Sequence, residues 1–446
     1  MTMNKEKNNL PPHWSWVKLG EVCSYSKGKM PQILREEKDK ECSIPYINIK
    51  AFEKGIFADY TNGIKCNLCD EGDLLMVWDG ARCGMIGKAK KGAVGSTLMK
   101  IKPNENLDKE YLFNFLLSKF QILNTKPKGV GIPHIEPNLL WNFEFVLPPL
   151  AEQHRIVAKI EALFSELDKG IESIKTAQQQ LKVYRRAVLK WAFEGKLTEE
   201  WRKKNLNGKS KMVRAQAGQQ QSMAAEPEVE YVASTGIEPS LPKGWSWKPL
   251  EQVSNAFGGY AFKSSDFKEK GKYQVIRIGN VRPGVLRLNE KPVFIECDDE
   301  NILSRSQLKH DDIIITLTGT KKKRDYGFTT SISDSNLLLN QRLAAIRFSK
   351  DYLPKFFLYY SWTDSFKDQF FANETGNVGQ GNVGMKAVTK TQIPFLSIEE
   401  QHQVVSEIES RLSVCDKLET TIEENLQQAE ALRQSILKKA FEGRLV

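Results

Sequence analysis

Two long stretches of this chain place apolar residues at alternating steps of three and four, the spacing of helices that pair in a coiled coil. The stretches span 151–195 and 397–443. Gly170 and Ala177 interrupt the first stripe, and Asn425 puts a polar group into the second, where it can fix helix pairing. The predicted seam consists of Ile156, Ile160, Leu163, Leu167, Ile174 and Leu181, continued by Tyr184, Val188 and Trp191, and of Val404, Ile408, Cys415, Leu418, Ile422, Leu432 and Ile436.

Both stretches also carry helix-end signals. Ser397 and Glu400 form a capping-box pattern, and Gly195 and Gly443 stand where the helices should stop. A helix of roughly 40 residues is about 60 Å long, and neither helix could bury its stripe alone. We therefore predict that the two helices pack side by side as an antiparallel pair that acts as a rigid spacer. The alternative is that each helix packs on its own domain as ordinary core.

The chain repeats itself. Shifting it by 248 places residues 147–197 over 395–445 without a gap, and 20 of these 51 pairs are identical. A second echo lies upstream at a shift of 231, where the Trp-Ser-Trp of 14–16 returns at 245–247. The unit of the repeat is therefore a variable domain followed by a constant helix.

The variable segments predict mixed α/β domains. Short β-rich runs at 74–77, 313–317 and 343–348 alternate with turns, and helical stretches follow at 109–120 and 352–370. The predicted fold is α+β: domains at 1–150 and 241–396, separated by the antiparallel coiled coil, with a pseudo-two-fold internal repeat. Residues 196–240 are predicted to be a flexible linker, because their polar composition from 203 onward cannot bury a core.

The charge balance points weakly to a polyanionic partner. Lysine and arginine outnumber aspartate and glutamate by 65 to 55, a formal charge of +10. The seven cysteines lack the pairing of a secreted disulfide scaffold, and no stretch approaches 18 uninterrupted apolar residues. These features predict a cytoplasmic protein with reduced thiols.

The Pro-Pro-Leu-Ala-Glu-Gln-His entry at 148–154, the amphipathic helix and the Ala-Phe-Glu-Gly-Lys-Leu exit at 192–197 resemble the specificity subunit of type I restriction-modification systems. The resemblance covers nearly the whole chain. It implies two target-recognition domains that each read one half of a split DNA site, with the coiled coil setting the gap. It also implies that the chain is not an enzyme by itself.

The resemblance further implies partners that carry the chemistry. Two adenine-N6 methyltransferase subunits would bring S-adenosylmethionine, and motor and nuclease subunits would bring ATP and Mg²⁺. No cofactor, metal or membrane is expected on this chain, whose direct ligand would be double-stranded DNA.

Base identity would be read by arginine, lysine, asparagine or glutamine side chains that reach groove edges, while other cations neutralise phosphates. The clearest candidate is the run of four cations from 321 to 324. For any single candidate, a solvated surface position or a phosphate contact is a more common role than a base contact. The predicted DNA-binding residues are Lys27, Lys29, Asn48, Lys50, Arg82, Lys88 and His134 in the first domain, and Lys263, Arg277, Asn280, Lys321, Lys322, Lys323, Arg324, Arg342, Gln380 and Asn382 in the second.

Other motifs favour structural interpretations. The tryptophans at 14, 16, 245 and 247 have the alternate spacing of core packing, and Cys66 and Cys69 form only half of a zinc-site pattern. A phosphate-binding glycine loop and an Asn-Pro-Pro-Tyr methyltransferase motif are absent from the sequence. Two rivals stay open: a subunit of a methylation-only or single-chain restriction enzyme, and a purely structural coiled-coil adaptor.

Overall fold

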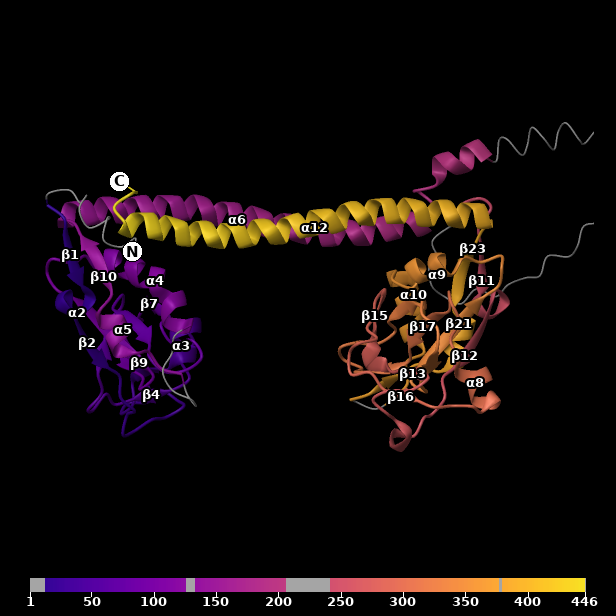
Figure 1. The fold of residues 1–446 in the computed structure, drawn as a ribbon, viewed down its shortest axis with the longest axis horizontal. Helices are drawn as coiled ribbons and strands as arrows, with labels where there is room; N and C mark the ends of the chain where they lie inside the picture. Colours follow the sequence, from indigo (N-terminus) through magenta and orange to yellow (C-terminus); the bar gives the residue numbers. More distant parts are fainter. Residues whose placement is uncertain (1–12, 126–132, 206–240, 377–378, 446) are drawn as a thin grey trace, which may run out of the picture. The chain divides into compact units, whose positions relative to one another are not determined.

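The computed structural model describes residues 13–125, 133–205, 241–376 and 379–445. The chain divides into two compact units: unit 1 comprises Met1–Thr176 and Thr421–Val446, and unit 2 comprises Ala177–Thr420. Each unit contains one mixed α/β domain and a part of each long helix (Figure 1). This confirms the predicted fold class.

Unit 1 is built on two four-stranded sheets. The first is antiparallel in the order β2-β9-β6-β7, and the second has the order β4-β3-β8-β5 with β3 parallel to β8. Strand β6 is buried on both faces, since alternate side chains point into two different apolar clusters. The elements are β1 (Ser15–Lys18), α2 (Leu19–Val22), β2 (Cys23–Lys27), β3 (Ile44–Ile47), α3 (Ile49–Lys54), β4 (Tyr60–Thr61), β5 (Leu68–Cys69), β6 (Leu74–Val77), β7 (Ile86–Lys88), β8 (Gly92–Val94), β9 (Leu98–Pro103), α4 (Lys109–Thr125), α5 (Pro137–Trp141) and β10 (Glu144–Leu147).

Unit 2 repeats this framework. Its antiparallel sheet has the order β12-β21-β17-β19, and β13 is parallel to β20 as β3 is to β8. The predicted helix at 352–370 is two helices, because the first ends with Ser361 as its C-cap and Thr363 caps the start of the next. The elements are β11 (Ser246–Pro249), β12 (Ser254–Gly258), β13 (Tyr273–Ile276), β14 (Val281–Arg282), β15 (Val285–Leu286), β16 (Phe294–Ile295), α8 (Glu300–Ser306), β17 (Ile313–Thr316), β18 (Thr318–Gly319), β19 (Thr329–Ser331), β20 (Leu337–Leu339), β21 (Leu343–Phe348), α9 (Pro354–Tyr360), α10 (Asp364–Ala372), β22 (Gly381–Asn382), α11 (Met385–Lys390) and β23 (Gln392–Phe395), with short 3₁₀ turns η1 (Leu250–Gln252), η2 (Ser264–Asp266) and η3 (Ile278–Asn280).

The long helices are α6 (Leu150–Phe193) and α12 (Ile398–Phe441), each of 44 residues. In unit 1 the Arg433 side chain pairs with Asp168, and in unit 2 Arg185 pairs with Asp416 at 2.6 Å. The two pairs are equivalent under the 248-residue shift, and both fit the same antiparallel register. Each helix also stops at a glycine with positive φ, Gly195 or Gly443.

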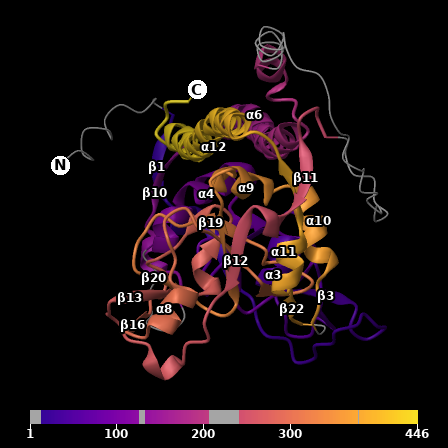
Figure 2. The same ribbon diagram turned by 90° about the vertical axis from the view of Figure 1, so that its right-hand side faces the viewer.

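The helix ends are also part of each domain's core. Ile156 and Ile160 join the apolar cluster of unit 1, and Val404 and Ile408 join that of unit 2. Figure 2 shows α9 of unit 2 between the sheet and the long helices. The two interpretations offered by the sequence therefore both apply: the helices pair, and their ends serve as ordinary core.

The seam prediction is wrong for four residues, because Leu418 and Leu432 are 49% and 50% exposed and Tyr184 and Trp191 are 37% and 36% exposed. In unit 1 the Asp168–Arg433 pair puts Leu432 opposite Lys169 and Gly170. Neither residue has an apolar side chain that could cover it. In unit 2 Leu418 lies level with Val183, which is exposed on the same outer face. The gap in the first stripe at Gly170 thus leaves Leu432 facing outward, whereas Leu418 faces outward together with Val183.

A buried glutamine fixes each long helix to its domain. Gln153 accepts a hydrogen bond from the Asp108 backbone at 2.7 Å and donates to the carbonyls of Asn106 and Pro148. Gln401 makes the matching three bonds to Leu353, Asp351 and Leu396 in unit 2. Both side chains are fully buried, so the repeated Glu-Gln-His entry is a structural clamp.

The predicted linker begins later than expected, and the prediction is wrong for residues 196–205. Residues 199–205 are helical, and Thr198 is fully buried. Arg202 donates to Glu400 at 2.9 Å, with 12% and 7% of the two side chains exposed. A buried ion pair with added hydrogen bonds orders a segment whose composition alone is too polar to fold. The rest of the predicted linker, 206–240, lies outside the described residues.

Candidate nucleic-acid interface

The polar loops of each domain meet at one end of its antiparallel sheet. In unit 1, β2 and β6 end where β9 begins, because Lys27 pairs with Met99 and Val77 with Leu98. In unit 2, β12 and β17 end where β21 begins in the same way. We call this end of each sheet the loop edge.

At both loop edges a glycine packs directly against the backbone of another segment, and we call this contact the glycine crossing. Gly28 donates to the Leu98 carbonyl at 2.9 Å, and Gly259 donates to the Leu343 carbonyl at 3.0 Å. A Cβ on Gly28 or Gly259 would lie 2.1 or 2.2 Å from a backbone oxygen, so only glycine fits either position. These glycines are related by the 231-residue shift, a signal that extending the upstream repeat would have found.

Four of the predicted residues of the first domain come together at the loop edge of unit 1. Lys27 and Lys29 flank the glycine crossing, Arg82 lies in the turn after β6, and His134 forms a β-bridge with Asp79 of that turn. Two of the cations already have carboxylate partners: Lys27 Nζ lies 3.0 Å from Asp79, and Arg82 lies 2.5 Å from Glu53.

The other three candidates of unit 1 have different roles or positions. Asn48 caps α3, accepting from the Ala51 backbone at 2.8 Å and donating to Asp59. This occupies both ends of its amide and argues against base reading. Lys50 is exposed in the first turn of α3. Lys88 lies at the opposite end of the sheet, opposite Leu74, and pairs with Glu110 at 2.8 Å.

The loop edge of unit 2 extends into a two-stranded ribbon, because Thr318–Gly319 pairs with Gly381–Asn382. The pairing of Asp79 with His134 in unit 1 occupies the same place, so His134 and Asn382 are equivalent. The Asn382 side chain is exposed, as is nearby Gln380. Both residues were predicted to bind DNA from their residue type alone, and nothing in the sequence indicated that they occupy equivalent positions.

The four consecutive cations form the turn that follows β18. Asp325 holds the turn by accepting from the Thr320 backbone at 2.6 Å, a bond that keeps the pKa of its carboxyl below the usual value. Arg324, with a positive φ, lies over the Phe371 ring at 4.8 Å. In the described part of the chain Lys321, Lys322 and Lys323 have no ion-pair partner. Their charge is therefore available to an outside anion.

Of the remaining candidates of unit 2, two are exposed, one is buried and one lines a cavity. Arg342 is exposed at the loop edge, where its carbonyl accepts from Leu317, and Lys263 is exposed at the start of η2. Asn280 is 3% exposed and bonds to three backbone groups of its own loop, so it cannot read bases. Arg277 lines a cavity together with Arg282 and Lys291, two cations that the sequence did not single out.

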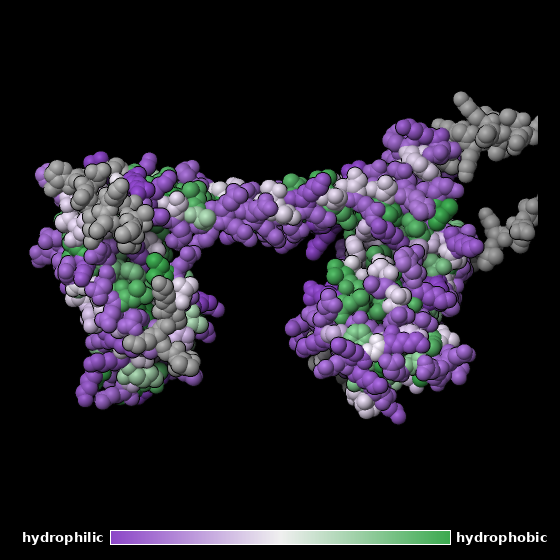
Figure 3. All heavy atoms as spheres, viewed as in Figure 1, coloured by the Kyte–Doolittle hydropathy of each residue, from purple (hydrophilic) through white to green (hydrophobic). Residues whose placement is uncertain are grey.

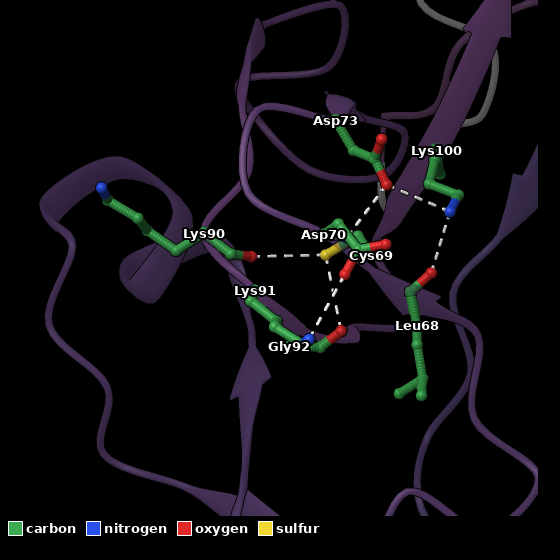
Figure 4. A network of polar contacts seen from close by, with 8 residues as sticks. All are labelled: Leu68, Cys69, Asp70, Asp73, Lys90, Lys91, Gly92 and Lys100. Carbon is green, nitrogen blue, oxygen red and sulfur yellow. Dashed lines mark hydrogen bonds and ion pairs between the residues drawn. The ribbon is translucent and has the colours of Figure 1, made fainter.

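Cys69, one half of the zinc-like spacing, belongs to a different network (Figure 4). Its thiol lies 3.4 and 3.5 Å from the carbonyls of Lys90 and Gly92, and burial raises its pKa to about 11. Lys100 pairs with Asp73 at 3.1 Å beside it. Asp73 precedes β6, so this network lies at the end of the sheet away from the loop edge and serves the fold.

Within the residues that the structure describes, no helix is long and apolar enough to cross a membrane. Among the same residues, no group of three or more histidine, cysteine, aspartate or glutamate side chains has the arrangement of a metal site.

The chain matches the family model described as the type I restriction modification DNA specificity domain at residues 11–181 and 242–428. It is similar to the type I restriction enzyme MjaVIII specificity subunit of Methanocaldococcus jannaschii, with 27% identity over 100% of this chain and 97% of the relative. It is also similar to the EcoKI specificity subunit of Escherichia coli, with 24% identity over 98% and 90% of the two chains.

Two solved structures share the fold. One is a chain from a study of complex assembly and conformational transition in a type I system, with a TM-score of 0.67 and 21% identity over 98% of this chain and 99% of that one. The other is the HsdS subunit from Thermoanaerobacter tengcongensis, with a TM-score of 0.54 and 20% identity over 99% and 100% of the two chains.

Proposed function

The chain belongs to the family of type I restriction-modification DNA specificity subunits, which are non-catalytic, and we propose that each of its two domains reads one half of a bipartite DNA site through its loop edge. The observation that carries this proposal is the repetition of the loop edge. Both domains form the same glycine crossing and the same strand ends, but they place different polar side chains on them. A shared frame with different surfaces suits two different half-sites.

The side chains at the loop edges divide into two chemical groups. Asn382, Gln380 and His134 carry amide or imidazole groups that can exchange hydrogen bonds with base edges. Lys29, Arg342 and the turn at 321–324 carry positive charge suited to phosphates. We propose that the first group contributes to sequence choice and the second to affinity.

The paired helices would set the distance between the half-sites. A bipartite site is recognised only when both readers face the groove at a fixed spacing and helical phase. The matching ion pairs of α6 and α12 give the two halves of the pair one register. Inserting one heptad into both helices should therefore lengthen the gap in the recognised sequence.

The helices also offer surface for partner subunits. In unit 2 the exposed apolar side chains include Val183, Val414 and Leu418, and hydrophobic residues reach the surface below the helix pair (Figure 3). A groove of 410 Å³ lies between the end of α6 and the domain of unit 2, where Phe193, Trp247 and Trp362 are among the residues that line it. We propose that methyltransferase subunits dock here, and that they and the motor subunits carry S-adenosylmethionine, ATP and Mg²⁺.

DNA binding by the chain together with its methyltransferase partner tests the proposal. A duplex carrying the selected target should outcompete a duplex with both half-sites scrambled by at least about a hundredfold. Asn382→Ala should relax the choice of base in one half-site and leave the other unchanged. Binding that is indifferent to sequence would contradict the proposal, and no DNA binding at any salt concentration would favour a structural adaptor.

A further inference from the structure

We propose that a cavity beside the loop edge of unit 2 binds a phosphodiester group of the DNA backbone. The cavity has a volume of 390 Å³, enough for a phosphate group and ordered water. It is lined by the loop that follows β13: Arg277, Ile278, Gly279, Asn280, Arg282, Glu290 and Lys291. The inference rests on the proposed DNA reading and adds to it a second contact with DNA that does not depend on sequence.

The charges around the cavity favour an anion. In the described part of the chain, Arg277, Arg282 and Lys291 have no carboxylate partner. The one carboxylate of the lining, Glu290, lies 3.5 Å from Arg287, a cation outside the lining. The cavity therefore keeps three uncompensated positive charges close together, which repel one another unless an anion lies between them.

The two guanidinium groups are held in place before any ligand arrives. Arg277 Nη2 donates to the Lys291 carbonyl at 2.6 Å, and Arg282 Nη1 donates to the carbonyls of Gly279 and Val281 at 3.1 and 2.8 Å. A guanidinium has five N–H donors, so each keeps several for a phosphate, which it can bind through two parallel bonds. Fixing the donors in advance lowers the entropy cost of binding.

The buried amide of Asn280 keeps the cavity loop in shape. It accepts from the Arg277 backbone at 2.9 Å and donates to the carbonyls of Arg287 and Glu290, both at 3.0 Å. These bonds join the beginning and the end of the loop. The cations of the cavity are thus positioned by the fold, whereas the lysines of the turn at 321–324 project from a surface turn.

The position of the cavity points to DNA. Asn340 donates to the Ile276 carbonyl at 3.1 Å, directly before Arg277, and forms a bridge with Tyr260 next to the glycine crossing. Arg342 follows two residues later. A duplex that lies along the loop edge therefore passes the mouth of the cavity, and the anion that DNA presents there is a backbone phosphate.

The matching loop of unit 1 is built differently and carries different charges. The Ile47 carbonyl accepts from Gly95 as Ile276 accepts from Asn340, but the chain then enters α3. That helix carries Glu53, which neutralises Arg82 at the loop edge. The same place in the fold is cationic in one domain and contains a carboxylate in the other, so the proposed phosphate grip belongs to unit 2 alone.

The test measures how DNA affinity depends on salt, using the full chain and a duplex of arbitrary sequence about three helical turns long. The variants are Arg282→Gln and Lys291→Gln. The matched control is Arg305→Gln, an exposed arginine of α8 that forms no ion pair within the described residues. Arg305 lies two residues before Gln307, whose carbonyl accepts from Arg347 at the end of the antiparallel sheet away from the loop edge. Sequence preference is measured in parallel with the selected target.

Each cavity variant should reduce the slope of log K against log salt by about 0.9, with sequence preference unchanged, and the control should leave the slope as it is. An unchanged slope in both cavity variants would overturn the inference. So would stabilisation of the wild type by inorganic phosphate without any change in the DNA slope, because the cavity would then serve a free anion. If the wild type itself binds without sequence preference, the proposed function fails instead.

Discussion

The loop edges of the two units share a backbone frame and differ in what happens to their positive charges. In unit 1, Lys27 and Arg82 are paired with Asp79 and Glu53 of the same domain. In unit 2, the lysines at 321–323 have no such partner within the described residues. A cation that is already paired must exchange its carboxylate for a phosphate, and the net gain is small. Unit 2 should therefore supply most of the electrostatic contribution to DNA affinity, and unit 1 should bind DNA more through direct contacts with bases.

A second difference lies at the starts of the long helices. Glu152 in unit 1 accepts from the Trp14 indole at 2.6 Å. Its repeat partner Glu400 instead binds Thr198 and Arg202, each at 2.9 Å, and the Trp245 indole N–H is buried with no hydrogen-bond partner in the described residues. The two equivalent glutamates thus make different contacts. Glu152 binds the start of its domain, and Glu400 binds the segment that follows α6.

The largest effect is expected at this second contact. Arg202→Met should destabilise the protein by about 3 kcal/mol, because it leaves the Glu400 carboxylate buried without a counter-charge. The measurement is urea denaturation followed by circular dichroism. Adding Glu400→Gln to this variant should restore most of the loss, since the buried charge is then gone. Equal stability of the single and double variants would show that the ion pair is not what orders residues 196–205.

The free cations of unit 2 should dominate DNA affinity. Changing Lys321, Lys322 and Lys323 together to glutamine should weaken binding at moderate salt by on the order of tenfold or more and lower the salt slope by about 2 to 3. The control is a Lys90→Gln, Lys91→Gln double variant, whose lysines have carboxylate partners away from the loop edge. A control that loses as much affinity would mean that overall charge, rather than the turn at 321–324, is responsible.

The tryptophans should respond differently to the same change. Trp14→Phe removes a hydrogen bond to a carboxylate and should cost about 1–2 kcal/mol more than Trp245→Phe, which removes none. Both replacements lose similar ring volume, so the difference in unfolding free energy isolates the hydrogen bond. The contrast between the two glutamates is disproved if the two variants are destabilised equally.

Freeing a paired cation of unit 1 should have the smallest effect. Glu53→Gln releases Arg82, and we expect DNA affinity to rise a few-fold and the salt slope to increase by about 1. Glu110→Gln releases Lys88 in the same way, but at the opposite end of the sheet, and should change neither quantity. A similar gain in both variants would indicate a general charge effect.

The architecture was predictable because its signals are local and repeated. The heptad spacing predicted helices at 151–195 and 397–443, and the structure has them at Leu150–Phe193 and Ile398–Phe441. The outward position of Leu418 and Leu432 was not predictable from spacing alone. It depends on which residues of the partner helix lie opposite, and heptad spacing does not reveal the register that the Arg185–Asp416 pair marks in the structure.

The candidate site was less predictable, because residue type does not reveal a side chain's partners. Asn48 and Asn280 have the chemistry of base readers, but the fold uses them to cap α3 and to close a loop. The carboxylates that neutralise Lys27 and Arg82 come from elsewhere in the chain and meet them only through tertiary packing. Arg282 and Lys291 were missed for the converse reason, because only the folded loop brings them to Arg277.

Mapping N6-methyladenine by long-read sequencing, in a methylation-free host that expresses this chain with a type I methyltransferase subunit from the same genome, tests the two-reader model most directly. We predict methylation at two short half-sites separated by one fixed gap, and a longer gap when one heptad is inserted into both α6 and α12. A contiguous methylated motif that is unaffected by the insertion, or no methylation at all, would contradict it.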